Sequence, residues 1–230
     1  MARTKDYQSA FDIIGPVMMG PSSSHTAGAV KIGKAARAIL GDTPEKIKVH
    51  YYESFAETHR GHGTDLAIIG GLLNFNTSDP RIKSSTKIAK EQGIDFEFIE
   101  EPGTSLGEHP NCALIQLDHG SRHVELNGIS IGGGAFKVKS IHVNQMCILM
   151  SHTPNILVID GECTISEVNH LINQLVEKEV DIKEVDINEE IKTMNAGRCL
   201  LALHLNKPID ESLLTSLKTA YPCLNFSYIQ

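Results

Sequence analysis

The sequence has no cluster of lysine and arginine residues, and its 230 residues carry 21 Lys and Arg against 28 Asp and Glu, a formal net charge of −7. Because nucleic acids are bound through basic patches, this composition argues against a nucleic-acid-binding protein. No apolar run approaches the length of a membrane span. Residues 1–7 also lack the apolar core of a signal peptide. We therefore expect a cytoplasmic protein with no membrane and no nucleic-acid partner.

Cysteine is scarce and irregularly spaced. The five cysteines stand at positions 112, 147, 163, 199 and 223. Their number is odd and no pair has the C-x-x-C spacing, so neither a disulfide framework nor a zinc ribbon is indicated. A complete set of iron–sulfur ligands is not visible either. The sequence therefore predicts no metal site within this chain.

The length and the patterning favour an α+β protein of two domains. The hydrophobic fraction of 41% and the charged fraction of 21% are ordinary for a globular protein. At this length two domains are a more natural interpretation than one. The segment from Ser151 to Asn155 is the predicted boundary, which gives a first domain over residues 1–151 and a second over residues 155–230.

Residues 21–26, Pro-Ser-Ser-Ser-His-Thr, place four hydroxyl groups and an imidazole directly before an apolar segment. Small hydroxyl residues favour helix N-termini, because their oxygens accept hydrogen bonds from the first backbone N–H groups. Lys31, Lys34 and Arg37 form a narrow polar stripe in the following helix, which Gly41 ends and which should otherwise be buried. Its N-terminus would suit a carboxylate or phosphate. The alternative is an ordinary capping loop.

A second turn, Gly61-His62-Gly63-Thr64-Asp65, precedes another apolar helix at residues 66–73. The glycines allow the backbone to approach a ligand closely, and Thr64 or Asp65 could cap the helix. A single histidine in a loop is usually only a surface residue. Two histidines at the starts of two buried helices, His25 and His62, instead favour a functional role.

Alternating and apolar segments predict the remaining elements of the first domain. We expect strands at residues 47–51, 94–98, 112–117 and 123–126, and a helix at residues 81–93. A loop over residues 101–111 contains His109-Pro110-Asn111. Residues 127–134 form a glycine-rich connection without the glycine order or the following helix of a dinucleotide-binding motif. It is either a flexible turn or a nest of backbone amides near the same ligand.

The second half predicts a ferredoxin-like β-α-β-β-α-β order. Strands are expected near residues 156–159, 180–187, 199–205 and 224–228, and a second helix around residues 213–217. Thr164 and Glu167 have the spacing of a capping box at the start of the first helix. No catalytic pattern occurs in this half. Because such domains commonly cover an apolar sheet face by pairing, oligomerisation is expected.

Taken together, four motifs occur in a fixed order: Gly20-Pro21-Ser22-Ser23-Ser24-His25-Thr26, Gly61-His62-Gly63-Thr64-Asp65, His109-Pro110-Asn111 and Ser130-Ile131-Gly132-Gly133-Gly134. The chain closely resembles the beta subunit of bacterial two-subunit, iron–sulfur-dependent L-serine dehydratases. A fold related to its first domain is the allosteric substrate-binding domain of some phosphoglycerate dehydrogenases. The remainder resembles the ACT domain at the end of these subunits. The chain departs from the family in having His59-Arg60 for Gly-Lys and Gly161-Glu162-Cys163 for Pro-Gly.

The resemblance implies a lyase that dehydrates L-serine to an aminoacrylate, which becomes pyruvate and ammonia. It implies a 4Fe-4S cluster as Lewis acid, bound by cysteines of an alpha subunit that completes the active site. His62 is expected to be a catalytic acid–base residue, and His25 is a second candidate for this role. The expected substrate-binding residues are Ser22, Ser23, Ser24, Thr26, Gly63, Thr64, Asp65, His109, Asn111, Gly132 and Gly133.

Other interpretations stay open at this point. Each of these residues could instead support loop geometry, and for Ser22 and His109 this alternative is equally favoured. The chain could also be a serine-binding regulatory module without chemistry. A third possibility is an oligomerisation scaffold, in which the ACT half pairs subunits as a homodimer or a hetero-oligomer.

Overall fold

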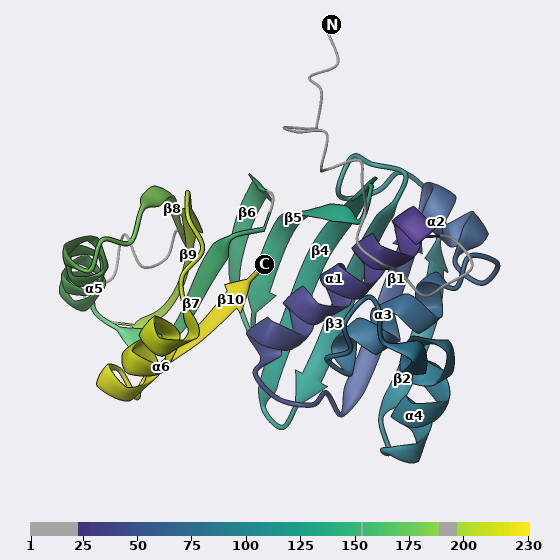
Figure 1. The fold of residues 1–230 in the computed structure, drawn as a ribbon, viewed down its shortest axis with the longest axis horizontal. Coiled ribbons are helices and arrows are strands. Elements are labelled where there is room, and N and C mark those ends of the chain that lie inside the picture. The colour runs from purple at the N-terminus through teal and green to yellow at the C-terminus, as the bar shows by residue number, and fades with distance from the viewer. Residues whose placement is uncertain (1–22, 153, 189–196) are drawn as a thin grey trace, which may run out of the picture.

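The structure, a computed structural model, describes residues 23–152, 154–188 and 197–230, and these residues form two β-sheets with helices packed on them (Figure 1). The predicted α+β class is confirmed. Within the described residues, no helix combines the length and the apolar character that crossing a membrane requires.

The first sheet and its helices occupy the chain up to residue 152. In order, the elements are α1 (Ser23–Leu40), β1 (Lys46–Tyr52), α2 (Glu53–Thr58), α3 (Thr64–Leu72), the 3-10 helix η2 (Pro80–Ser84), α4 (Ser85–Glu91), β2 (Asp95–Glu101), β3 (Cys112–His119), β4 (Arg122–Gly132), β5 (Ala135–Val143) and β6 (Met146–His152). The strand order is β2-β1-β3-β4-β5-β6. Only β1 and β2 pair in parallel, because the helices between them form the crossover that parallel pairing needs.

Helix α1 lies across the first sheet, where it contacts β3, β4 and β5 (Figure 1). Its apolar side chains are almost completely shielded from solvent, and the predicted stripe of Lys31, Lys34 and Arg37 is half-buried. The helix ends where the sequence predicts. Gly41 has a φ of 83° and donates its backbone N–H to the carbonyl of Arg37 at 3.0 Å.

Helices α1 and α3 touch through their backbones at two glycines. A Cβ on Gly71 would lie 2.1 Å from the carbonyl oxygen of Val30, and one on Gly33 would lie 2.4 Å from the carbonyl oxygen of Ile68. Any side chain at either position would therefore collide with the backbone of the facing helix. This contact sets how closely α3 can pack beside α1.

The structure corrects several predicted boundaries. Helix α3 begins at Thr64 after the left-handed Gly63, so neither Thr64 nor Asp65 caps it. The helix predicted at residues 81–93 is divided into η2 and α4. Helix α2 was not predicted, because its six residues are too few to show a helical period.

The glycine-rich connection predicted over residues 127–134 is mostly strand. β4 continues to Gly132, with register shifts after Asn127 and after Ser130, and the hairpin to β5 turns at Gly133 and Gly134. All three glycines from 132 to 134 have a positive φ, which side chains other than glycine rarely adopt. Pairing with β3 and β5 on both sides holds this segment extended despite its glycines.

The second sheet follows the predicted β-α-β-β-α-β order. Its elements are β7 (Ile156–Cys163), α5 (Ile165–Glu177), β8 (Ile182–Ile187), β9 (Gly197–Leu205), α6 (Glu211–Ala220) and β10 (Leu224–Ile229), with strand order β10-β7-β9-β8. The capping box at Thr164 and Glu167 is confirmed, since each residue's side chain accepts the other's backbone N–H.

Both faces of the second sheet are apolar. Along β9, Leu201 and Leu203 pack in a core with residues of α5 and α6, whereas the alternating Leu200 and Ala202 join the core of the first sheet. The period of two along a strand separates these faces. The uncovered sheet face on which the expectation of oligomerisation rested is therefore covered, at least in part, within the chain itself.

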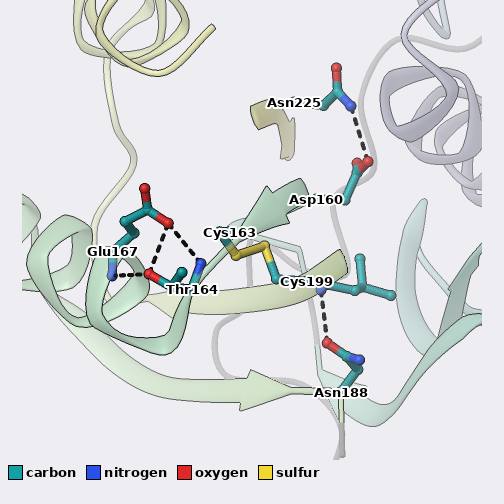
Figure 2. The surroundings of a disulfide bond; sticks show 8 residues. Asp160, Cys163, Thr164, Glu167, Asn188, Cys199 and Asn225 are labelled. Carbon is teal, nitrogen blue, oxygen red and sulfur yellow. Dashed lines mark hydrogen bonds between the residues drawn. A yellow bond between two sulfur atoms is a disulfide. The ribbon is translucent and has the colours of Figure 1, made fainter. Parts of the chain in front are cut away.

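A buried ion pair also joins the two sheets. The guanidinium of Arg122 in β4 donates to both carboxylate oxygens of Asp160 in β7, at 2.7 and 2.6 Å, and to the carbonyl of Ile39 at 2.9 Å. The side-chain amide of Asn225 donates to the same carboxylate at 3.0 Å (Figure 2). Asp160 is only 3% exposed, so these contacts provide the partners that a buried carboxylate requires.

Cys163 and Cys199 form a disulfide between β7 and β9 (Figure 2). This bond corrects the interpretation that the cysteine spacing indicates no disulfide. The two cysteines are 36 positions apart in the sequence, and their Cα atoms come within 6.1 Å because β7 and β9 are antiparallel neighbours. The spacing of cysteines in the sequence cannot indicate a disulfide between two strands that become neighbours only through the order of strands in the sheet.

The contact between α1 and α3 predicts a strong effect of Gly71→Ala. The added methyl group collides with the carbonyl of Val30, and since the obstacle is backbone, relief requires the helices to separate. We expect a loss of at least about 2 kcal/mol in the free energy of unfolding, measured by denaturant titration. Gly197→Ala is the matched control, because a Cβ there meets no atom of the described residues within 4 Å. Equal stability of the two variants would contradict this packing.

Candidate functional site

The serine-rich stretch is the first turn of α1 rather than a loop before it. The described part of the helix begins at Ser23, so the residues interpreted as a turn that leads into the helix are already helical from Ser23 on. Ser22 lies outside the described residues, and for Ser23, Ser24 and His25 only the backbone is described. Thr26 is buried. An anion site at the start of α1 would therefore lie within this motif.

The fourth motif lies directly against α1. A Cβ on Gly28 would lie 2.4 Å from the Oγ atom of Ser130 and 3.3 Å from the carbonyl oxygen of Ala135. The helix thus approaches the end of the β4–β5 hairpin as closely as a glycine allows. The Gly132–Gly133 turn follows Ser130 at the end of that hairpin.

The third motif is bonded to the fourth. The backbone N–H of Ser130 donates to the carbonyl of Asn111 at 3.0 Å. The N–H of Asn111 in turn donates to Nδ1 of His109 at 3.1 Å, and the N–H of His109 donates to Oγ of Ser105 at 2.7 Å. One imidazole nitrogen of His109 therefore shapes its own loop, which is the alternative role considered for this residue.

The second motif is connected through α2. The N–H of Phe55 donates to the carbonyl of Pro110 at 3.1 Å, and the N–H of His62 donates to the carbonyl of Thr58 at 3.0 Å. The side chain of His62 is exposed, whereas Gly63 and Thr64 are buried. The structure therefore links all four motifs in one region, with the imidazole of His62 facing solvent.

The histidine with the most extensive contacts is His59, which was noted in the sequence only as a departure from a family pattern. It is 1% exposed, and its two nitrogens lie 2.6 Å from Oδ1 of Asp65 and 3.0 Å from Oε1 of Glu100. Its ring stacks on Tyr51, with centroids 4.5 Å apart. Asp65, expected to bind substrate, thus has one carboxylate oxygen engaged by His59.

The charges around His59 alter neighbouring groups. The hydrogen bond from His59, together with the charge of Arg60, lowers the pKa of Glu100. Burial, reinforced by the nearby Asp65 carboxylate, raises the pKa of Tyr51 well above its ordinary value. The network holds the turn before α3 in place. Neither the burial of His59 nor its contact with Glu100, 41 residues away, has a local sequence pattern, so only the family departure at this position could have drawn attention to it.

Comparison with known proteins identifies the family. The family described as "Serine dehydratase beta chain" matches residues 9–140, more than half of the chain. The chain belongs to the serine dehydratase beta chain family.

Two relatives match almost the whole length of this chain. The chain is 42% identical to "Probable L-serine dehydratase, beta chain" of Bacillus subtilis, over 92% of this chain and 93% of that one. It is 34% identical, over the same shares of both chains, to "L-serine dehydratase, beta chain" of Peptoniphilus asaccharolyticus. "L-serine dehydratase 2" of Escherichia coli is 46% identical over 54% of this chain but only 28% of its own.

The five cysteines of this chain do not fit an iron–sulfur cluster. Cys163 and Cys199 are bonded to each other, and Cys112 is buried with its thiol against Oδ1 of Asn127 at 3.0 Å. Cys147 lies in β6 beside His142, and Cys223 is exposed. All five cysteines are among the described residues, and no cysteine belongs to a group of side chains placed to share a metal ion.

The burial of Cys112 predicts that it resists alkylation. Burial raises the pKa of its thiol to about 11, so the reactive thiolate is rare at lower pH. We expect iodoacetamide, near pH 8 and without denaturant, to label the exposed Cys223 while Cys112 stays unmodified, as measured by peptide mass spectrometry. Labelling of both in denaturant is the control. Equal labelling rates in the folded chain would contradict the burial of Cys112.

Proposed function

We propose that this chain is the beta subunit of an L-serine dehydratase, which converts L-serine to pyruvate and ammonia. The observation that carries the proposal is the identity of 42% and 34% with two chains named as L-serine dehydratase beta chains, over 92% of this chain. The linked arrangement of the four motifs supports it, because residues far apart in the sequence meet in one region.

The proposal includes an alpha subunit that holds the 4Fe-4S cluster. The matched region makes up 28% of the longer Escherichia coli relative. The relatives that are named as beta chains imply a further subunit, which would supply what the longer relative carries in one chain. The cysteines described above fit no cluster, which also supports placing it on the partner.

The reaction sets requirements that the motif region suits. Loss of the α-proton and the β-hydroxyl as water gives aminoacrylate, and hydrolysis of its imine tautomer gives pyruvate and ammonia. The substrate carboxylate stays ionised throughout. The N-terminus of α1, an 18-residue helix that starts within the hydroxyl run, offers backbone N–H groups and a positive dipole end for it. Ser22, Ser23, Ser24 and Thr26 are the proposed contacts.

His62 is the proposed acid–base residue of this chain. Its imidazole is exposed between two glycines, and its backbone is anchored by Thr58 at the end of α2. An exposed side chain on an anchored turn suits a group that moves protons at a site completed by a partner. His59 is the proposed positioning residue, because it contacts Asp65 and Glu100 and stacks on Tyr51.

The second sheet is proposed to be an ACT domain. Its β-α-β-β-α-β order and the strand order β10-β7-β9-β8 support this assignment. A shallow cleft of about 460 Å³ opens beside Glu162, Thr164 and Arg198. The ACT domain would then regulate the enzyme or join its subunits. The assembled enzyme is proposed to be a cytoplasmic hetero-oligomer.

The two-subunit proposal predicts that the purified chain alone is folded, colourless and inactive. We expect no iron–sulfur absorbance and no pyruvate from L-serine until the alpha subunit, with its cluster assembled, is added. Absorbance spectra and a pyruvate assay of each subunit and of their mixture decide the question. Serine deamination by the isolated chain would overturn the assignment.

His62→Ala in the assembled enzyme should reduce turnover by about 10²–10⁴-fold, the usual cost of losing one general acid–base group. The melting temperature of the variant enzyme should not change, because the lost imidazole is exposed. Turnover and melting are measured on the same sample.

His170→Ala is the matched control, since His170 is another exposed histidine, on α5 of the second sheet. It should leave both quantities unchanged. Wild-type turnover of His62→Ala at full subunit assembly would remove His62 from the active site. It would then leave His25 as the acid–base candidate of this chain.

A further inference from the structure

Three potential metal ligands meet where the two sheets join. His152 is the last residue of β6, at the edge of the first sheet. Asp186 lies in β8 and His204 in β9, two neighbouring strands of the second sheet. Strand β6 contacts both β8 and β9. The three side chains thus come from three strands of two different sheets.

Strand register brings these groups to one face. His204 is in phase with Leu200 and Ala202, which pack in the core of the first sheet rather than against α5 and α6. Glu184 is paired with His204 in the β8–β9 ladder, and Asp186 follows it two residues later on the same face. The second sheet therefore presents one imidazole and two carboxylates toward His152.

The distances are short enough for one ion to be shared. Each of His152, Asp186 and His204 offers one ligand atom, and these atoms lie within 4.8 Å of one another. The Nε2 atom of His204 is 2.7 Å from Oδ2 of Asp186, and the two imidazole centroids are 3.8 Å apart. Oε2 of Glu184 lies 3.4 Å from Nε2 of His152.

One nitrogen in this cluster has no protein partner. His204 is only 4% exposed, and within the described part of the chain its Nδ1 atom is fully buried without a hydrogen-bond partner. A buried polar atom left unpaired costs about 1–3 kcal/mol, so such atoms call for an explanation. The orphaned nitrogen is an observation separate from the clustering. An ion bound at Nδ1 would give it a partner, whereas an ion bound at Nε2 would not.

We propose that His152, Asp186 and His204 bind a divalent transition-metal ion such as Zn²⁺, with Glu184 beside His152. Two imidazoles and a carboxylate suit Zn²⁺ and its neighbours, whereas Ca²⁺ and Mg²⁺ prefer oxygen ligands alone. The ion would fasten the end of the first sheet to β8 and β9. This site is distinct from the proposed active site and does not depend on that function.

The test is metal binding by the full-length chain, prepared without a histidine tag and stripped of metal by a chelator. We expect calorimetric titration with ZnCl₂ to show a tight site for one ion per chain, and Co²⁺ to give visible absorption bands at the same stoichiometry. Zn²⁺ should also raise the melting temperature, because an ion that binds only the folded chain stabilises it.

Two variants locate the site. His152→Gln and Asp186→Asn should each weaken Zn²⁺ binding by at least about tenfold, since losing even an outer-shell partner of a metal ligand costs that much. The asparagine retains a hydrogen-bonding group toward His204, and His152 lies at a strand end. Circular dichroism establishes that each variant is folded, and if one is not, the other decides.

His142→Gln is the matched control. His142, in β5, also lies near a carboxylate and a thiol, with its Nδ1 atom 3.7 Å from Glu125 and its Nε2 atom 3.1 Å from Cys147. It should leave the tight site unchanged. No stoichiometric Zn²⁺ binding to the wild-type chain overturns the proposal. Undiminished binding by both folded site variants, or loss of the tight site in the control, also overturns it.

Discussion

The close packing of α1 is the constraint on which the rest of the structure depends. Its apolar side chains fill the core of the first sheet, and its backbone touches α3 where Gly33 meets Gly71. The same helix approaches Ser130 at Gly28, which places its first turn beside the β4–β5 hairpin. Because the helix contacts the sheet, α3 and β10 at once, a shift in α1 would move all the motifs together.

The two histidines of the second motif region illustrate different physical roles. His59 is buried between two carboxylates and a tyrosine ring, and so it positions the turn. His62, three residues later, is exposed and anchored only through its backbone N–H in the contacts described above. The proposed active site, completed by another subunit, would need this division, because the proposed reactive group has to face outward while its support is rigid.

Several contacts among the described residues join the two sheets. Leu200 and Ala202 share the first core, and Arg122 and Asp160 form a buried, doubly hydrogen-bonded ion pair. The His152 cluster adds a third contact near the connection between β6 and β7. A ligand or ion that acts on the second sheet would therefore act through a packed interface, rather than through a flexible linker alone.

Local patterns in the sequence were sufficient for α1, the second-half βαββαβ order and the capping box at Thr164, because each depends on residues only a few positions apart. The four motifs also identified the family that the comparisons confirm. The disulfide between Cys163 and Cys199, the burial of His59 and the His152 cluster could not be predicted in this way. Each joins residues that only strand order or register brings together, and register depends on the whole packed sheet rather than on any short segment.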